Sequence, residues 1–204
     1  METIHDFIKN EVPKYLNGRV LDIGGGEGRW KRILSEYATE YFISDLYSQA
    51  ADFKDDARKL SNESSSFNAI VCFEVLEHID DTERVVSEMY RVLKPGGYVA
   101  ATLPFIFPSH GNPDDYKRLT PSGLEYYFKK MGFQVVQSGK IGNVLTILGV
   151  YCKYKVKDYA KKGKNRHLGK YFFLILQQIF RKLSSRFRYI GPDYFTHSFI
   201  IAKK

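Results

Sequence analysis

The sequence predicts an α/β fold in which a mostly parallel sheet carries helices on both faces. Short apolar runs alternate along the chain with amphipathic stretches, which is the pattern of parallel strands joined by helical crossovers. A cluster of glycines directly follows the first apolar run and precedes a helix-like stretch, as at a turn that admits a ligand. A chain of 204 residues buries one such core without a second domain.

Apolar runs, and residues that typically begin or end helices, predict the individual elements. The best-defined helix follows Asp80, which forms a capping-box pattern with Glu83, and residues 94–97 (Lys-Pro-Gly-Gly) are expected to end it. Thr120 and Pro121 are expected to open another helix. The predicted strands are residues 19–23, 41–44, 69–73, 98–103, 133–136 and 197–202, and the predicted helices are residues 30–37, 81–93 and 120–130.

Cysteine usage and hydropathy indicate a cytoplasmic protein. Cys72 lies in an apolar run expected to be a buried strand, and Cys152 lies far from it in the chain, so no disulfide is expected. The N-terminal stretch mixes charged with apolar residues, unlike a signal peptide. No stretch reaches the roughly 20 apolar residues that span a bilayer.

The net charge of +8 comes from one segment of the chain. Residues 1–150 hold 17 Lys and Arg against 21 Asp and Glu, whereas residues 151–190 hold 12 against 1. A mildly acidic body therefore carries a basic segment. We expect an electrostatic partner to bind that segment rather than the whole surface.

The glycine turn favours S-adenosylmethionine (SAM) over a dinucleotide. Gly24, Gly26 and Gly28 complete a G-x-G-x-G pattern, whereas Arg29 occupies the position where a dinucleotide fingerprint needs glycine or alanine. Glycines let a ligand approach the backbone, and the following helix start suits a carboxylate. Asp45 comes 21 positions after Gly24 at the end of the second strand, where it can accept hydrogen bonds from ribose hydroxyls; alone it would be an ordinary turn residue.

Five segments, VLDIGGGEG, ISD, DDARKL, FNAIVCFEVLEHI and RVLKPGGYVAATLP, stand in the order found in class I SAM-dependent methyltransferases of the bacterial small-molecule group. The chain resembles that family over about residues 15–140. The resemblance implies a Rossmann-like, mostly parallel seven-stranded sheet with an antiparallel last strand. It also implies that SAM contacts Asp22, Gly24 and Gly26 on the methionine side, Asp45 and Leu46 at the ribose, Asp56 and Ala57 at the adenine, and Phe73 and Glu74 beneath the sulfonium. Asp56 could equally cap a helix.

The loop after the fourth strand is expected to bind the methyl acceptor. Transfer to a hydroxyl needs a base, and His110 is our candidate, although a loop histidine is often only solvated. The pattern H-x-x-P-x-D-Y-x-R from His110 also resembles a loop in methyltransferases that accompany glycosyltransferases in surface-polysaccharide pathways. That likeness implies that Asp115, Tyr116 and Arg118 bind a polyhydroxylated acceptor or lock the loop; Arg118 could instead simply pair with Asp115.

The residues Glu74, Glu77 and His78 offer a metal-binding alternative. Their E-x-x-E-H spacing resembles a motif of the methyltransferases that modify small-RNA 3′ ends, and His110 would be a fourth ligand. Metal-free relatives carry similar residues. We therefore expect no metal, and His78 to be a helix-start or packing residue.

Residues 143–193, between the last two strands, are expected to form a basic, amphipathic helical insertion in a single methyltransferase domain. Residues 168–190 place aromatic and aliphatic side chains on one helical face and basic residues opposite them. Three roles remain open: packing on the body or a second copy, contact of residues 165–190 with the inner membrane surface, and RNA binding. RNA is least favoured, because no nucleic-acid module accompanies the charge.

These observations predict a SAM-dependent methyltransferase that O-methylates a sugar or glycan intermediate. Other small molecules, such as a quinone precursor or a lipid headgroup, and RNA remain alternative acceptors. A non-catalytic SAM-binding scaffold is the alternative from a different class.

Overall fold

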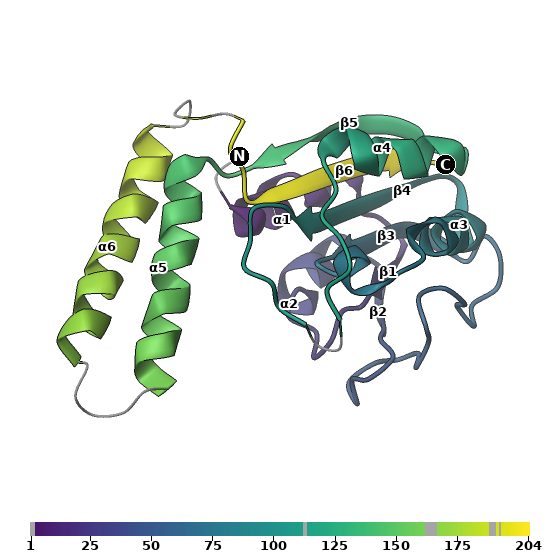
Figure 1. The fold of residues 1–204 in the computed structure, drawn as a ribbon. Helices are drawn as coiled ribbons and strands as arrows, with labels where there is room; N and C mark the ends of the chain where they lie inside the picture. The colour runs from purple at the N-terminus through teal and green to yellow at the C-terminus, as the bar shows by residue number, and fades with distance from the viewer. Residues whose placement is uncertain (1–2, 112–113, 162–166, 188–190, 192) are drawn as a thin grey trace.

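The computed structural model describes residues 3–111, 114–161, 167–187, 191 and 193–204 (Figure 1). Six strands and nine helical segments lie in this part of the chain. The strands are β1 (Arg19–Ile23), β2 (Glu40–Ser44), β3 (Phe67–Phe73), β4 (Leu93–Pro104), β5 (Gln134–Ile141) and β6 (His197–Lys203). The helices are α1 (Ile4–Asn10), η1 (Val12–Tyr15), α2 (Lys31–Leu34), η2 (Ser35–Tyr37), η3 (Leu76–His78), α3 (Thr82–Val92), α4 (Pro121–Lys130), α5 (Val144–Lys161) and α6 (His167–Arg186).

The strands form one mixed sheet in the order β2-β1-β3-β4-β6-β5. β1 pairs in parallel with β2 and β3, β3 pairs in parallel with β4, and β6 runs antiparallel to both β4 and β5. The α/β class and the antiparallel last strand are confirmed. The count of seven strands is wrong for the described residues: between β2 and β3 only isolated bridges form, Ser44 with Phe53 and Asp56 with Lys59. That stretch is rich in charged and polar residues and lacks an apolar run to bury.

Side chains of β3 alternate between two cores, one on each face of the sheet. Ile70 and Cys72 join the core beneath α3 and α4, whereas Val71 and Phe73 join the core beneath α1 and α2. Helices therefore cover both faces, as the sequence predicted (Figure 1).

Two predictions about the ends of helix α3 are wrong. Asp81, not Asp80, caps α3, since its side chain accepts the backbone N–H of Arg84. Asp80 instead pairs with Arg58. Residues 94–97 already belong to β4, because the glycine pair lets the backbone pass closely beside β3.

α5 and α6 lie side by side and project away from the sheet beyond its β5–β6 end (Figure 1). Asn143 begins this helical hairpin by accepting the N–H groups of Leu145 and Thr146, and its amide donates to the Ser184 carbonyl of α6. The two helices lie within the predicted insertion, but the sequence indicated only α6, because apolar residues surround the start of α5 instead of forming one stripe. Residues 188–190 of the predicted helix lie outside the described residues. No described helix is long and apolar enough to cross a membrane.

Candidate cofactor and acceptor site

A cavity of about 360 Å³ opens at the carboxyl ends of β1, β2 and β3. This volume falls within the usual range for small-molecule sites. Residues from all three strand ends, from the loop after β2 and from the loop after β4 contribute to it. The lining comprises Ile23, Gly24, Ser44, Asp45, Leu46, Tyr47, Asp55, Asp56, Ala57, Arg58, Glu74, Val75, His78, Ile79, Asp80, Asp114 and Tyr116.

The glycine turn after β1 has the backbone that its sequence predicts. Gly24, Gly26 and Gly28 all have positive φ angles of 68°, 54° and 76°. A Cβ on Gly24 would come within 3.0 Å of the Val75 side chain across the turn. Gly24 lines the cavity, whereas Gly26 and Gly28 shape the turn without lining it.

Asp22 supports the glycine turn from below and does not line the cavity. Its carboxylate is almost fully buried and accepts a 2.8 Å hydrogen bond from the Tyr41 hydroxyl. Burial raises its pKa to about 7, the Tyr41 hydrogen bond opposes this, and the nearby Asp45 charge adds to it. That Asp22 contacts the cofactor stays a prediction.

Asp45 faces the cavity and also organises its own loop. One carboxylate oxygen accepts the N–H of Gly26 at 3.0 Å, and the other accepts the N–H groups of Tyr47 and Ser48 at 2.9 Å. Leu46 and Tyr47 follow it with large exposed side chains on the cavity wall. Asp45 therefore occupies the predicted ligand-binding position and also acts as a turn residue.

Asp56 and Ala57 line the cavity beside Asp45. Asp56 accepts hydrogen bonds from the Arg58 side chain at 2.7–3.2 Å and from its backbone N–H, and the Arg58 side chain holds the pKa of Asp56 below its usual value. No helix begins at Asp56, so its alternative role as a helix cap is wrong.

Phe73 and Glu74, at the end of β3, point in different directions. The Phe73 ring packs against Phe7 and Trp30 in the core and does not line the cavity, so a floor beneath the sulfonium from its side chain is not seen. Glu74 does line the cavity, from a left-handed backbone with φ of 60°. Its carboxylate accepts from the Thr102 hydroxyl at 3.0 Å and lies 3.1 Å from His197 Nε2.

The loop after β4 is held by its own polar residues. Arg118 donates to both oxygens of Asp115, one of them at 2.7 Å, and this pairing holds the pKa of Asp115 well below its usual range. Asp115 also accepts the His110 N–H at 3.0 Å. The alternative that Arg118 pairs with Asp115 is confirmed. Tyr116 lines the cofactor cavity, and Pro113 of the predicted motif lies outside the described residues.

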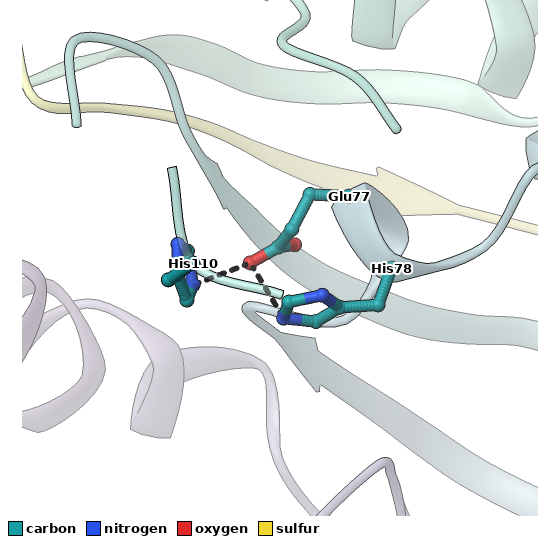
Figure 2. A group of neighbouring side chains, drawn as sticks. All are labelled: Glu77, His78 and His110. Atoms are coloured by element: carbon teal, nitrogen blue, oxygen red, sulfur yellow. Dashed lines mark ion pairs between the residues drawn. The ribbon is translucent and has the colours of Figure 1, made fainter. Parts of the chain in front are cut away.

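Glu77, His78 and His110, called the Glu77 cluster here, meet between η3 and the loop after β4 (Figure 2). Glu77 Oε1 lies 3.6 Å from His78 Nε2 and 3.8 Å from His110 Nε2. Burial raises the pKa of Glu77 to about 8, and the charge of Glu74 adds to this. His78, expected to be a packing residue, thus faces a second imidazole.

The cavity is strongly acidic, which the sequence motifs did not indicate. Its lining holds six carboxylates, at Asp45, Asp55, Asp56, Glu74, Asp80 and Asp114, and one guanidinium, that of Arg58. Arg58 is bound to two of these carboxylates. Asp80 and Asp114 come from loops that fold over the cavity, and no motif identifies them. Such a lining favours a cationic ligand such as a sulfonium and disfavours a pyrophosphate.

Comparison with known proteins agrees with this site. The profile of the methyltransferase domain family matches residues 2–138. A ubiquinone biosynthesis O-methyltransferase of Xylella fastidiosa is 28% identical over 144 residues, which cover 60% of this chain and 58% of that protein. A sterol 24-C-methyltransferase of Neurospora crassa is 33% identical over 97 residues, which cover 39% and 26%. The chain thus spans little more than half of these relatives at most.

Solved structures show the same fold. A SAM-dependent methyltransferase of Archaeoglobus fulgidus superposes with a TM-score of 0.62 at 18% identity, covering 98% of this chain and 94% of that one. The cyclase SpnF gives 0.65 at 18% identity, covering 98% and 81%. A Haemonchus contortus phosphoethanolamine N-methyltransferase in complex with S-adenosyl-L-methionine gives 0.56 at 22% identity, covering 92% and 49%. The chain therefore belongs to the methyltransferase domain family, as its glycine turn and acidic strand ends predicted.

Proposed function

We propose that the chain is a SAM-dependent O-methyltransferase that binds SAM in the cavity at the ends of β1, β2 and β3. The acidic lining is the observation that carries this proposal. A cavity with six carboxylates suits a ligand with a sulfonium and an ammonium group. Asp45 can share its oxygens with ribose hydroxyls, and the exposed Leu46 beside it offers an apolar wall for the adenosine.

Calorimetric titration with SAM and with S-adenosylhomocysteine tests the binding step. Asp45→Asn should weaken both affinities by about tenfold or more, since one charge-assisted hydrogen bond contributes about 1.5–3 kcal/mol. Asp193→Asn is the matched control, because Asp193 pairs with Lys140 on the surface with 87% of its side chain exposed. A folded wild-type protein without affinity for either compound would refute the proposal.

For the transfer step, bound SAM supplies an electrophilic methyl group in an in-line displacement. The acceptor oxygen forms the new bond to the methyl carbon, the carbon–sulfur bond breaks, and its electron pair stays on sulfur. The acceptor proton must leave, and the Glu77 cluster lies beside the cavity, which His78 itself lines. That His110 is the general base stays a prediction.

Two acceptor classes follow from different observations. A sugar or glycan intermediate was predicted through Asp115 and Arg118, but these side chains are engaged with each other, so this preference now depends on Tyr116. A phenolic acceptor, such as a quinone precursor, is supported by the ring of Phe107, which contacts His110 and Tyr154, and by the ubiquinone O-methyltransferases among the relatives. Screening radiolabelled methyl transfer to catechols, nucleotide sugars and lipid-linked glycans separates the two classes.

We propose that the α5–α6 hairpin contacts an anionic membrane surface, which would bring the enzyme to a lipid-linked acceptor. One face of α6 exposes Tyr171, Phe172, Ile175 and Ile179, each by 43–60%. Exposed basic side chains, those of Arg181, Lys182 and Arg186, continue along the same helix. Aromatic and aliphatic groups beside cations suit an interface with anionic headgroups. That the hairpin is an insertion in a single domain stays a prediction.

Vesicle flotation tests the membrane contact. The wild-type chain should float with phosphatidylglycerol vesicles and not with neutral ones, and Phe172→Ser with Ile175→Ser should abolish flotation. Tyr126→Ser, at an equally exposed ring on α4, is the control. Equal flotation of both variants, or a stable dimer that buries this face, would contradict the proposal.

A further inference from the structure

Glu77 is a buried carboxylate without a hydrogen-bond partner. Its side chain is fully buried, and neither of its oxygens accepts a hydrogen bond from the described residues. Burying a carboxyl group without a hydrogen-bond partner is unfavourable. A group bound at the position that Oε1 faces would offset this cost.

The two histidines of the Glu77 cluster turn their Nε2 atoms toward this carboxylate. His78 Nδ1 is hydrogen-bonded to the Asp114 carbonyl, and His110 Nδ1 lies 3.2 Å from the Pro108 carbonyl. A carbonyl only accepts, so each Nδ1 carries a proton, and Nε2 is the ring atom left to bind a metal. Both Nε2 atoms face Glu77 Oε1 (Figure 2). Three possible ligand atoms thus converge at one place.

The separations suit three ligands of one ion better than hydrogen bonds. At 3.6 and 3.8 Å the nitrogen–oxygen pairs are too far apart for hydrogen bonds. All three ligand atoms lie within 4.8 Å of one another. Around an ion with bonds of about 2.1 Å, neighbouring ligand atoms lie about 3–3.5 Å apart, so small side-chain shifts would close the site. The Nδ1 hydrogen bonds to carbonyls are the orienting contacts typical of metal-binding histidines.

We propose that Glu77, His78 and His110 bind one divalent first-row transition cation, with an open coordination position for the acceptor oxygen. Two imidazoles and a carboxylate suit zinc, iron, cobalt or manganese better than magnesium or calcium. Glu74, the other carboxylate of the E-x-x-E-H pattern, is not a ligand, because Thr102 and His197 hold it.

This inference rests on the proposed O-methylation and changes how the acceptor loses its proton. An acceptor hydroxyl that binds the cation ionises more readily, and its proton passes to water. The oxygen then attacks the methyl carbon, and the electron pair of the breaking bond stays on sulfur as before. His110 acts as a ligand in this scheme instead of as a base. Because His78 also lines the cavity proposed for SAM, the cation would lie beside that cavity.

Equilibrium dialysis of the full chain against Co²⁺, with visible absorption spectra, tests the site. We expect one tightly bound Co²⁺ per chain and ligand-field bands from nitrogen and oxygen ligands. His110→Gln and His78→Gln should each weaken binding at least tenfold and lose the bands. His5→Gln is the matched control, since His5 is an exposed residue that contacts Trp30 and does not belong to the cluster. Circular dichroism checks that each variant folds. Because 34% of the His110 side chain is exposed, we expect at least His110→Gln to fold.

The outcomes separate this inference from the proposed function. Absence of stoichiometric Co²⁺ binding, or binding that both glutamine variants retain, overturns the metal site. SAM affinity measured on the same wild-type sample reports on the proposed function alone. If the chain binds SAM but no Co²⁺, the proposed methyltransferase function stands, and His110 is again the candidate base.

Discussion

Replacing Asp22 with asparagine should remove a pH dependence of stability that originates beneath the glycine turn. Asp22 is almost fully buried, and burial raises its pKa from 3.8 to about 7. The folded protein therefore holds this proton up to near-neutral pH, whereas the unfolded chain releases it near pH 4. Folding becomes less favourable as pH rises through this window, because the folded state must either keep the proton or bury the charge.

The magnitude follows from the pKa difference. At about 1.4 kcal/mol for each pH unit, the rise from 3.8 to about 7 corresponds to about 4 kcal/mol of unfolding free energy. This loss of unfolding free energy is absent below pH 4, grows between pH 4 and 7, and is complete above pH 7. Asparagine has no proton to lose and still accepts the Tyr41 hydroxyl, so the variant should gain stability over wild type as pH rises.

Urea unfolding followed by the fluorescence of Trp30, the only tryptophan, measures the effect between pH 5 and 8. Tyr41→Phe is an informative partner, because the Tyr41 hydrogen bond lowers the pKa of Asp22 and its loss should extend the pH dependence to higher pH. Asp193→Asn, at an exposed carboxylate, should leave the profile unchanged. If the wild type and Asp22→Asn give parallel profiles, the assigned proton is not on Asp22 and the reasoning is wrong.

Three further predictions concern the turn, the acceptor loop and the core. Gly24→Ala should weaken SAM binding at least tenfold, because the added methyl group crowds the turn. Gly96→Ala is the control: Gly96 has a left-handed backbone but no neighbour within 4 Å, so thermal melting of this variant measures the backbone strain alone. Arg118→Lys cannot hold both oxygens of Asp115, so steady-state kinetics should show a higher acceptor KM with a smaller change in kcat. Glu88→Gln should lower the free energy of unfolding by about 1–3 kcal/mol at pH 7. Because Arg91 lowers the pKa of Glu88, this difference should shrink as pH falls toward 4, which thermal unfolding can measure.

The strands could be predicted because their patterns are local. The run ending at Ile23 is apolar except for Arg19 and Asp22, and the run ending at Phe73 is apolar except for Asn68, as is typical of strands buried on both faces. Glycine positions also report directly on backbone geometry, so the turn at Gly24 was recognisable from its spacing. The cavity position of Asp45 followed from its place at a strand end, whereas that of Asp56 was implied by the resemblance alone.

Residues whose role depends on a long-range contact could not be predicted in this way. The acidic contribution of Asp80 and Asp114 arises only when two loops, 34 positions apart, fold over one cavity. The same holds for Asp22, whose binding position was inferred by resemblance. Its burial against Tyr41 depends on how β1 and β2 align, which no single segment encodes.

The E-x-x-E-H pattern shows how backbone geometry decides between two readings of one motif. On a helix, Glu74 and Glu77 would lie on one face three residues apart and could share an ion. Here Glu74 has a left-handed φ of 60°, a conformation that costs about 1–3 kcal/mol outside glycine and persists only where the surroundings hold it. The Glu74 N–H donates to the Thr102 carbonyl, and its carboxylate is held by the same threonine and by His197. The backbone then enters η3 one residue after Val75, so Glu77 turns inward toward the two imidazoles. The two carboxylates are thereby separated by a single strained residue: Glu74 lines the cavity and contacts His197 of β6, whereas Glu77 lies buried beside the two imidazoles.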